Sequence, residues 1–113
     1  MAAAYCPRRG DLVWMDLDPA AGSEQTGHRP VLVVSADAYN RKVGMAVVCP
    51  VTNKAKGYPF EVPLPEGLAV KGVILSDHLG SKDWRSRRAR LICRAPDSVV
   101  DEVLGRVAVL FQS

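Results

Sequence analysis

Short runs of apolar residues, separated by glycine, proline and polar turns, constrain this chain more than any other feature of its sequence. Six such runs lie at residues 11–17, 31–35, 45–49, 58–62, 73–75 and 89–93. Runs of this kind are typical of β-strands. The run at 31–35 is almost continuously apolar, so we expect it to lie inside a sheet with both faces covered, whereas 58–62 alternates as a half-solvated antiparallel strand does.

The last part of the chain has a different period. After Pro96, apolar residues recur at spacings of three and four, namely Val99, Val100, Val103, Leu104, Val107, Leu110 and Phe111. This spacing predicts one helix with a single apolar face, and Pro96 suits its first turn. A short helical turn is expected at residues 37–42. Together the patterns predict a mainly β fold, a small curved antiparallel sheet or half-barrel with a C-terminal α-helix.

The length of 113 residues suits one domain, 1–113, and no repeat or linker divides it. No apolar stretch approaches the roughly 20 residues that span a membrane. No signal peptide is visible, so we expect a cytoplasmic protein. The cysteines at positions 6, 49 and 93 lack ligand spacing, so neither a zinc site nor a disulfide framework is expected, and Cys49 is interpreted as a core residue.

Positive charge is concentrated in one segment. The net charge is only +3, but between residues 81 and 94 six basic residues accompany one acid, Asp83. The basic residues are Lys82, Arg85, Arg87, Arg88, Arg90 and Arg94. Such a segment can contact phosphates, and a solvated basic loop is the alternative interpretation.

The polar segment at residues 22–30 gathers a carboxylate, an imidazole and a guanidinium: Glu24, His28 and Arg29. Its glycines let the backbone turn at positive φ. Arg29 is expected immediately before the strand at 31–35, so a rigid element can position its guanidinium against a phosphate. We therefore interpret this loop as the centre of an active site.

Three blocks of sequence carry a resemblance to a known family. They are Gly10-Asp11-Leu12-Val13-Trp14 with Gly22-Ser23-Glu24-Gln25 and Gly27-His28-Arg29-Pro30; Pro50-Val51-Thr52 with Lys56-Gly57-Tyr58-Pro59-Phe60-Glu61-Val62; and Ser76-Asp77-His78 with Trp84-Arg85. In this order and spacing, from about Tyr5 to the C-terminus, they resemble the MazF/PemK-like toxins. These are sequence-specific endoribonucleases, or mRNA interferases, of type II toxin-antitoxin systems.

The resemblance implies an SH3-like barrel, a homodimer and a cognate MazE-like antitoxin, whose acidic, flexible segment suits the basic segment. It also implies that DNA is contacted only through the antitoxin complex. The substrate would be single-stranded RNA, cleaved without a cofactor by attack of the ribose 2′-OH to give a 2′,3′-cyclic phosphate and a 5′-OH. No metal is expected, because Glu24, Glu61 and Asp77 fall on separate segments without a ligating pattern.

The family places catalysis on Arg29 and Thr52. Arg29 can stabilise the charge that builds on the phosphate, and Thr52 can donate its hydroxyl to a non-bridging oxygen. The proton acceptor stays open between Glu24, which the loop motif carries, His28, which titrates near neutrality, and water. Either side chain could instead orient Arg29.

Some members of the family use an aspartate with an arginine two residues before it. Asp77 matches the aspartate, but Leu75 stands at the arginine position, so we expect Asp77 to be a substrate contact or a loop-stabilising acceptor. Base recognition is expected from residues of the loops around the site. These candidates are His28, Asn40, Asn53, Lys54, Lys56, Ser76, Asp77, His78, Lys82 and Trp84.

A different class of function competes with RNA cleavage. CcdB-like gyrase inhibitors share this fold but bind a protein target without catalysis, so they need neither Arg29 nor Thr52. Residues 109–113 lack the tryptophan-bearing tail that those inhibitors use on their target. An RNA-binding barrel without catalysis is a third alternative. The filled loop motif favours the endoribonuclease.

Overall fold

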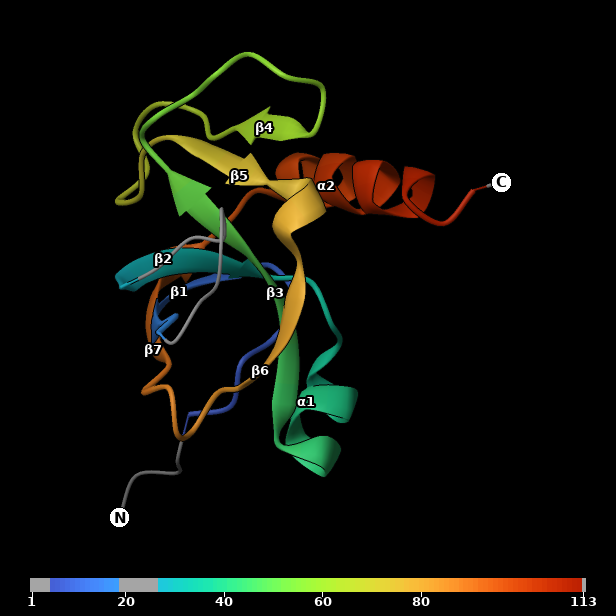
Figure 1. The fold of residues 1–113 in the computed structure, drawn as a ribbon. Helices are drawn as coiled ribbons and strands as arrows, with labels where there is room; N and C mark the ends of the chain where they lie inside the picture. The colour runs from blue at the N-terminus through green and yellow to red at the C-terminus, as the bar shows by residue number, and fades with distance from the viewer. Residues whose placement is uncertain (1–4, 19–26, 113) are drawn as a thin grey trace.

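The computed structural model describes residues 5–18 and 27–112, which form a strongly curved β-sheet with two α-helices (Figure 1). The strands are β1 (Asp11–Asp16), β2 (His28–Val33), β3 (Met45–Thr52), β4 (Glu61–Pro63), β5 (Val73–Leu75), β6 (Gly80–Asp83) and β7 (Arg90–Arg94). The helices are α1 (Asp37–Val43) and α2 (Asp97–Val109), and a 3-10 turn, η1 (Ser76–His78), follows β5. Over these residues, no helix combines the length and the apolar character that crossing a membrane requires.

The sheet bends along β3. The strand order is β4-β5-β3-β2-β1-β7, every pair is antiparallel, and β6 pairs with the first half of β3. The last two residues of β3, Val51 and Thr52, pair with β5 instead. In the described part of the chain no pairing joins β7 to β6 or to β4, so the curved sheet stays open. The predicted curved antiparallel sheet with a C-terminal helix is confirmed.

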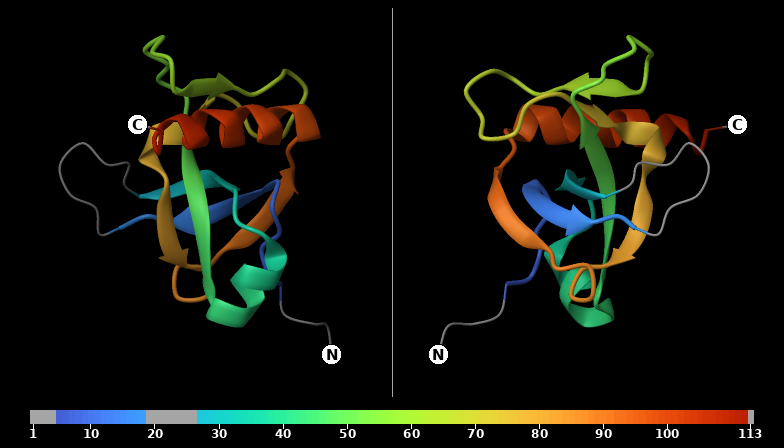
Figure 2. Two further views of the ribbon diagram at one scale, coloured as in Figure 1. Left: turned by 90° about the vertical axis from the view of Figure 1, so that its right-hand side faces the viewer. Right: turned by 60° about the vertical axis from the view of Figure 1, so that its left-hand side comes forward.

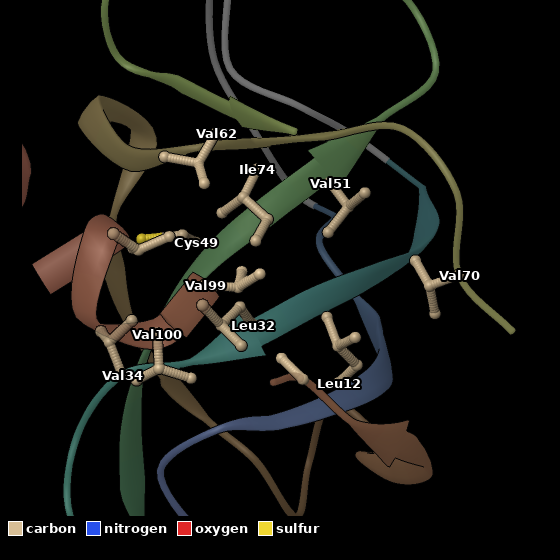
Figure 3. Packing of buried hydrophobic residues seen from close by; sticks show 12 residues of the cluster. Leu12, Leu32, Val34, Cys49, Val51, Val62, Val70, Ile74, Val99 and Val100 are labelled. Atoms are coloured by element: carbon tan, nitrogen blue, oxygen red, sulfur yellow. The ribbon is translucent and has the colours of Figure 1, made fainter. Parts of the chain in front are cut away.

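Each face of the sheet carries its own apolar core, because neighbouring residues of a strand point to opposite sides. The first core lies under α2 and includes Leu32, Cys49, Ile74 and Val99 (Figure 3). The second core lies on the opposite face and includes Val31, Val33, Met15 and Trp84. Strand β2 is therefore covered on both faces, as its sequence predicted, and Cys49 is confirmed as a core residue.

Helix α2 lies across one end of the sheet beside β4 and β5 (Figure 2). The residues that it buries are Val99, Val100 and Val103. The helix was predicted, but its apolar stripe is shorter than expected, because the helix ends at Val109 and Phe111 is 77% exposed. Figure 1 shows this end of α2 projecting past the strands.

The predicted strand at 58–62 is wrong over most of its length, since only β4 joins the sheet. The carboxylate of Glu61 accepts hydrogen bonds from the backbone N–H groups of Lys56 and Gly57, each at 2.8 Å. The N–H of Glu61 donates to the carbonyl of Tyr58 at 3.1 Å. These local bonds close a turn and use groups that a longer strand would offer to its neighbour.

Strand β2 begins three residues earlier than predicted, so Arg29 is its second residue rather than the end of a loop. The reason is the pairing with β1, which continues as far as Asp16 opposite His28. Strand β6 lies inside the segment expected to be a basic loop, and it forms by pairing with β3. The bounds of β1 and α1 differ from prediction by one residue at one end, and those of β7 differ by one residue at each end.

Candidate active site

Arg29 and Thr52 lie at the ends of two neighbouring strands. Strands β2 and β3 pair through Val31 with Pro50, Leu32 with Cys49 and Val33 with Val48. In this register each step back along β2 matches one step forward along β3. The pairing ends at Val31 and Pro50. Arg29 lies two residues before Val31 and Thr52 two residues after Pro50, so both stand just beyond the part where the two strands pair with each other.

The two side chains project from the same face of the sheet. Val31 stands two residues after Arg29, on the same face of β2, and packs in the second core. Val48, which stands on the same face of β3 as Thr52, packs in that core as well. Arg29 is half-buried and Thr52 is 7% exposed. Alternation along the strands therefore assigns Arg29 and Thr52, 23 residues apart in the sequence, to the face of the second core.

The surroundings of Thr52 are closely packed. Its hydroxyl oxygen accepts a hydrogen bond from the backbone N–H of Lys54 at 3.2 Å. This bond uses a lone pair and leaves the hydroxyl hydrogen able to be donated. On the other side lies Gly72, where an added Cβ would be 2.3 Å from the Thr52 carbonyl oxygen. Only glycine allows the start of β5 to approach the Thr52 backbone so closely.

A pocket of about 570 Å³, which we call the Arg29 pocket, opens beside these strand ends. Its walls include Trp14, His28, Arg29, Val51, Asn53 and Lys71. Val51 and Asn53 are the neighbours of Thr52, whereas Thr52 itself is not among the residues that line the pocket. Arg29 therefore takes part in the pocket, and Thr52 is represented there only by its two neighbours.

His28 stands in the wall of the Arg29 pocket with its ring fixed on two sides. Its Nδ1 lies 2.7 Å from Oδ1 of Asp16, and its ring stacks on Trp14 with centroids 5.2 Å and planes 10° apart. An ionised carboxylate only accepts hydrogen bonds, so Nδ1 of a neutral ring carries the hydrogen and Nε2 keeps its lone pair. Nε2 is therefore chemically able to accept a proton.

The strand ends next to the polar loop are tied together. The N–H of Leu17 donates to the carbonyl of Gly27 at 2.8 Å, and the N–H of Gly27 donates to Oδ1 of Asp18 at 3.0 Å. These bonds fix the position at which β2 begins. Glu24, the predicted base, lies outside the described residues.

Comparison with known proteins decides the family. The model of the PemK-like, MazF-like toxins of type II toxin-antitoxin systems matches residues 8–111. The chain belongs to this family. The endoribonuclease toxin MazF of Escherichia coli (strain K12) is 51% identical over 89 residues, which is 79% of each chain. The endoribonuclease PemK of Escherichia coli is 39% identical over 106 residues, 90% of this chain and 80% of PemK.

Solved structures agree with this assignment. The crystal structure of MazF (Form-I) from Deinococcus radiodurans has a TM-score of 0.93 and 53% identity, and the match covers 96% of this chain and 98% of that one. The chain is also similar to the crystal structure of MazE-MazF (Form-II) from the same organism, with a TM-score of 0.85 and 48% identity. This match covers 96% of this chain and 97% of that one. The predicted family is confirmed.

Three residues of this MazF-like chain that were predicted to recognise bases are buried, and the structure corrects that interpretation. Asn40 is fully buried, and its Nδ2 donates to the carbonyls of Pro7 at 2.8 Å and Ser35 at 3.1 Å. Trp84 is 4% exposed, and its Nε1 donates to the carbonyl of Asn40 at 3.0 Å. Ser76 is also fully buried. The Asn40 and Trp84 side chains hold segments together, and none of the three side chains reaches solvent.

The predicted role of Lys82 in base recognition is corrected for a different reason. It pairs with Ala46, six residues before Thr52 on β3, which corresponds to about 20 Å along a strand. The structure therefore does not bring Lys82 to the Arg29 pocket. His78 is half-buried in η1, which contacts α2.

The residues predicted to recognise bases on the loop after β3 are accessible to solvent. Asn53, Lys54 and Lys56 are all exposed, and Asn53 lines the Arg29 pocket. The loop is held by the hydroxyl of Tyr58, which donates to Oδ1 of Asp77 at 2.7 Å. Desolvation raises the pKa of Tyr58, and the hydrogen bond to Asp77 and its charge raise that pKa further. Of the two roles expected for Asp77, the contacts support that of loop-stabilising acceptor.

The basic segment divides into two groups. Arg87 donates through Nη1 to the carbonyls of Asp16 at 3.1 Å and Asp18 at 3.2 Å. Arg94 donates through Nη1 to Oδ1 of Asp11 at 2.8 Å. These two arginines hold β1 in place, so the interpretation of the whole segment as a phosphate-binding patch is too broad. Arg85, Arg88 and Arg90 are exposed.

Two further groups have strongly raised pKa values. Burial raises the pKa of Tyr5, and so do its 2.6 Å hydrogen bond to Asp11 and the charge of that carboxylate. Burial raises the pKa of the Cys49 thiol to about 12, with a smaller effect of the Asp77 charge. Both groups are structural, since neither lines the Arg29 pocket.

Sequence reasoning missed Asp16 and Lys71. Asp16 reaches His28 because the β1–β2 register sets the two residues opposite each other. Trp14 and Asp16 are two residues apart and so share a face of β1, and a known register would have indicated that both lie on the same face as His28. Lys71 comes to the pocket through the segment before β5, for which the sequence carries no signal. Within residues 5–18 and 27–112, no three metal-ligating side chains gather in one place.

Proposed function

We propose that this MazF-like chain is the toxin of a type II toxin-antitoxin system and a sequence-specific endoribonuclease that cleaves single-stranded mRNA. The observation that carries the proposal is the family match over residues 8–111, combined with Arg29 and Thr52 on one face at neighbouring strand ends. The relatives MazF and PemK are both named as endoribonucleases, which supports RNA cleavage over the binding of gyrase.

In this proposal the ribose 2′-OH loses its proton and attacks the adjacent phosphate, and the bond from phosphorus to the 5′ oxygen breaks. The leaving 5′ oxygen takes a proton from solvent, so the products are a 2′,3′-cyclic phosphate and a 5′-OH. The nucleophile belongs to the substrate, so the reaction proceeds without a metal ion. Arg29 stabilises the developing negative charge, because its guanidinium stays protonated and its planar donors match phosphate oxygens. Thr52 donates its hydroxyl hydrogen to a non-bridging oxygen when the substrate enters.

The proton of the 2′-OH needs an acceptor. Glu24 is the acceptor that the family motif carries. His28 is the alternative, and its hydrogen bond to Asp16 supports it, because that bond leaves the lone pair of Nε2 available. Asp16 acts as a positioning residue in that case. Water is the third possible acceptor.

Recognition of bases is assigned to the exposed side chains around the Arg29 pocket. Asn53, Lys54 and Lys56 present polar groups on the loop after β3, and His28 and Trp14 offer aromatic rings in the pocket wall. Single-stranded RNA is read through hydrogen bonds to splayed bases and through stacking.

The partners follow from the family. We expect a homodimer that binds a cognate MazE-like antitoxin and contacts DNA only through that complex. The MazE-MazF structure from Deinococcus radiodurans supports the antitoxin. An acidic, flexible antitoxin segment complements the exposed basic residues of this chain electrostatically. The site of action is the cytoplasm, where messenger RNA is translated.

RNA cleavage in EDTA tests the mechanism. A long natural RNA is digested and the cuts are mapped by primer extension, which also reports the recognition sequence. An oligonucleotide with that sequence should be cut in the presence of EDTA, and a single 2′-deoxy substitution at the cleaved nucleotide should block the cut. Strict dependence on a metal, or cleavage of the deoxy oligonucleotide, would overturn the mechanism. Inhibition of gyrase without any RNA cleavage would favour the CcdB-like alternative.

A substitution of Arg29 tests the site. Arg29→Ala should lower kcat by about a hundredfold or more, because it removes the main charge stabilisation of the transition state. Arg41→Ala is the matched control, since Arg41 is an exposed arginine on α1, remote from the pocket. Both variants should unfold cooperatively in urea. An Arg29→Ala variant that cuts at the rate of the control would show that the active site lies elsewhere.

A further inference from the structure

A second hollow adjoins the Arg29 pocket. It has a volume of about 590 Å³, and Asp16, His28, Arg88, Ala89 and Arg90 line it. We call it the Arg88 hollow. His28 lines both the Arg29 pocket and the Arg88 hollow. The two hollows therefore meet at His28.

The strand register places two aromatic rings and an arginine on one face. Trp14 is opposite Pro30 in the β1–β2 pair and opposite Arg90 in the β1–β7 pair, and Asp16 is opposite His28. Residues opposite each other in a ladder, and residues two apart in a strand, share a face of the sheet. Arg90, Trp14 and His28 therefore project from one face, and the rings of Trp14 and His28 stack on each other there.

The Arg88 hollow has an excess of positive charge. Arg88 and Arg90 are exposed, and one carboxylate, that of Asp16, lies with them. Asp16 is already engaged, since Oδ1 lies 2.7 Å from Nδ1 of His28 and Oδ2 lies 4.0 Å from Nε of Arg88. Two guanidinium groups against one carboxylate suit an anion, and guanidinium forks match the oxygens of a phosphate.

The turn that carries Arg88 is fixed to β1. The N–H of Asp16 donates to the carbonyl of Arg87 at 3.0 Å, and the Arg87 side chain donates back to the Asp16 carbonyl at 3.1 Å. Arg88 has a φ of 58°, the only positive φ outside glycine in the residues described. L side chains rarely adopt this conformation. The hydrogen bonds hold the backbone of the turn in place at the edge of the hollow.

We propose that the Arg88 hollow is a phosphate subsite for RNA. It binds a phosphodiester that flanks the cleaved one, and His28, which lines both the Arg29 pocket and the Arg88 hollow, lies between the two. A basic groove combined with aromatic rings is the usual arrangement for binding single-stranded nucleic acid. The inference rests on the proposed endoribonuclease function, because it assigns part of the path of that substrate.

The test is a binding scan with neutral linkages. The probe is the mapped recognition oligonucleotide with a 2′-deoxy cleavage site, and each of its phosphates is replaced in turn by an uncharged methylphosphonate. One linkage next to the cleaved one should weaken binding to the natural protein by about tenfold or more. The double variant Arg88→Gly/Arg90→Gln should bind the unmodified probe as weakly as the natural protein binds the probe with that neutral linkage. Its own affinity should not change when that linkage is made neutral. Glycine at position 88 keeps the backbone conformation of the turn.

Salt dependence gives a second readout. The slope of log K against log salt should fall by about 0.7 for each phosphate contact that the double variant loses. The control is Arg41→Gln/Lys42→Gln, which removes two positive charges from the exposed end of α1. Two results would overturn the subsite while RNA cleavage stands. One is an equal loss of RNA affinity in the two double variants, and the other is a linkage scan that is the same for the natural protein and the Arg88 double variant. A natural protein that cuts no RNA would overturn the proposed function, and the subsite with it.

Discussion

Gly72→Ala is the substitution that connects the packing of the sheet with the proposed chemistry. Gly72 precedes β5 with a φ of +118°, and the next residue, Val73, pairs with Thr52. A Cβ at this position would lie 2.3 Å from the carbonyl oxygen of Thr52 and 2.9 Å from its carbonyl carbon. Both contacts are with backbone, which cannot rotate away as a side chain does.

The size of the effect follows from these distances. A Cβ needs a separation of at least 3.0 Å, so the backbones of Gly72 and Thr52 must move apart by 0.7 Å or more. Such overpacking costs about 1–3 kcal/mol of the free energy of unfolding. A side chain at this φ costs about another 1–3 kcal/mol. A displacement of about 1 Å at a catalytic group can also lower the rate on the order of a hundredfold.

Gly67→Ala separates the two contributions. Gly67 has a φ of +91° and no atom within 4 Å of an added Cβ, so its substitution carries the conformational cost without the clash. Urea unfolding at an unchanged m-value should show Gly72→Ala to be less stable than Gly67→Ala by about 1–3 kcal/mol. Single-turnover RNA cleavage, measured where both variants are folded, should be slow only for Gly72→Ala. Equal stability and equal rates in the two variants would refute this reasoning.

Three other predictions concern single groups. Thr52→Val should lower kcat by about a hundredfold to a thousandfold while RNA affinity and the urea midpoint stay near those of the natural protein; a fully active variant would remove the hydroxyl from the mechanism. Stability should fall as the pH rises above about 10, because unfolded tyrosine ionises there while the raised pKa keeps folded Tyr5 protonated. Urea titrations should show a shallower fall for Tyr5→Phe, and an identical fall would contradict this origin. Cys49, with a pKa of about 12, should resist iodoacetamide at pH 8 until urea unfolds the protein; mass spectrometry of the native protein showing rapid modification of Cys49 would contradict its burial.

Much of the fold could be predicted because the two periodicities are strong. The continuous apolar run ending β2 indicated a strand inside the sheet, and the structure covers it with a core on each face. The spacing of Val99, Val100 and Val103 indicated α2 and the face that it buries. These patterns are local, and each reflects how one element meets an apolar surface.

The candidate site could be predicted only in part. Residue chemistry and the family motif identified Arg29 and Thr52, but a loop position could not be distinguished from a buried one. Asn40 and Trp84 look like loop residues in the sequence, yet a hydrogen bond from the Trp84 indole to the Asn40 carbonyl joins them across 44 residues inside the protein. Such contacts depend on where other segments of the chain lie.

The order of the amino acids was enough to indicate the family, the strands with strong apolar patterns, the C-terminal helix and the residue types available for chemistry. Which of those residues meet depends on how the chain folds. Strand register set Asp16 opposite His28 and Arg90 opposite Trp14, and the bend of β3 brought Gly72 against Thr52. The physical reason is that side-chain pattern depends on the nearest residues of the chain, whereas register and close approach depend on hydrogen bonds and packing between segments far apart in it.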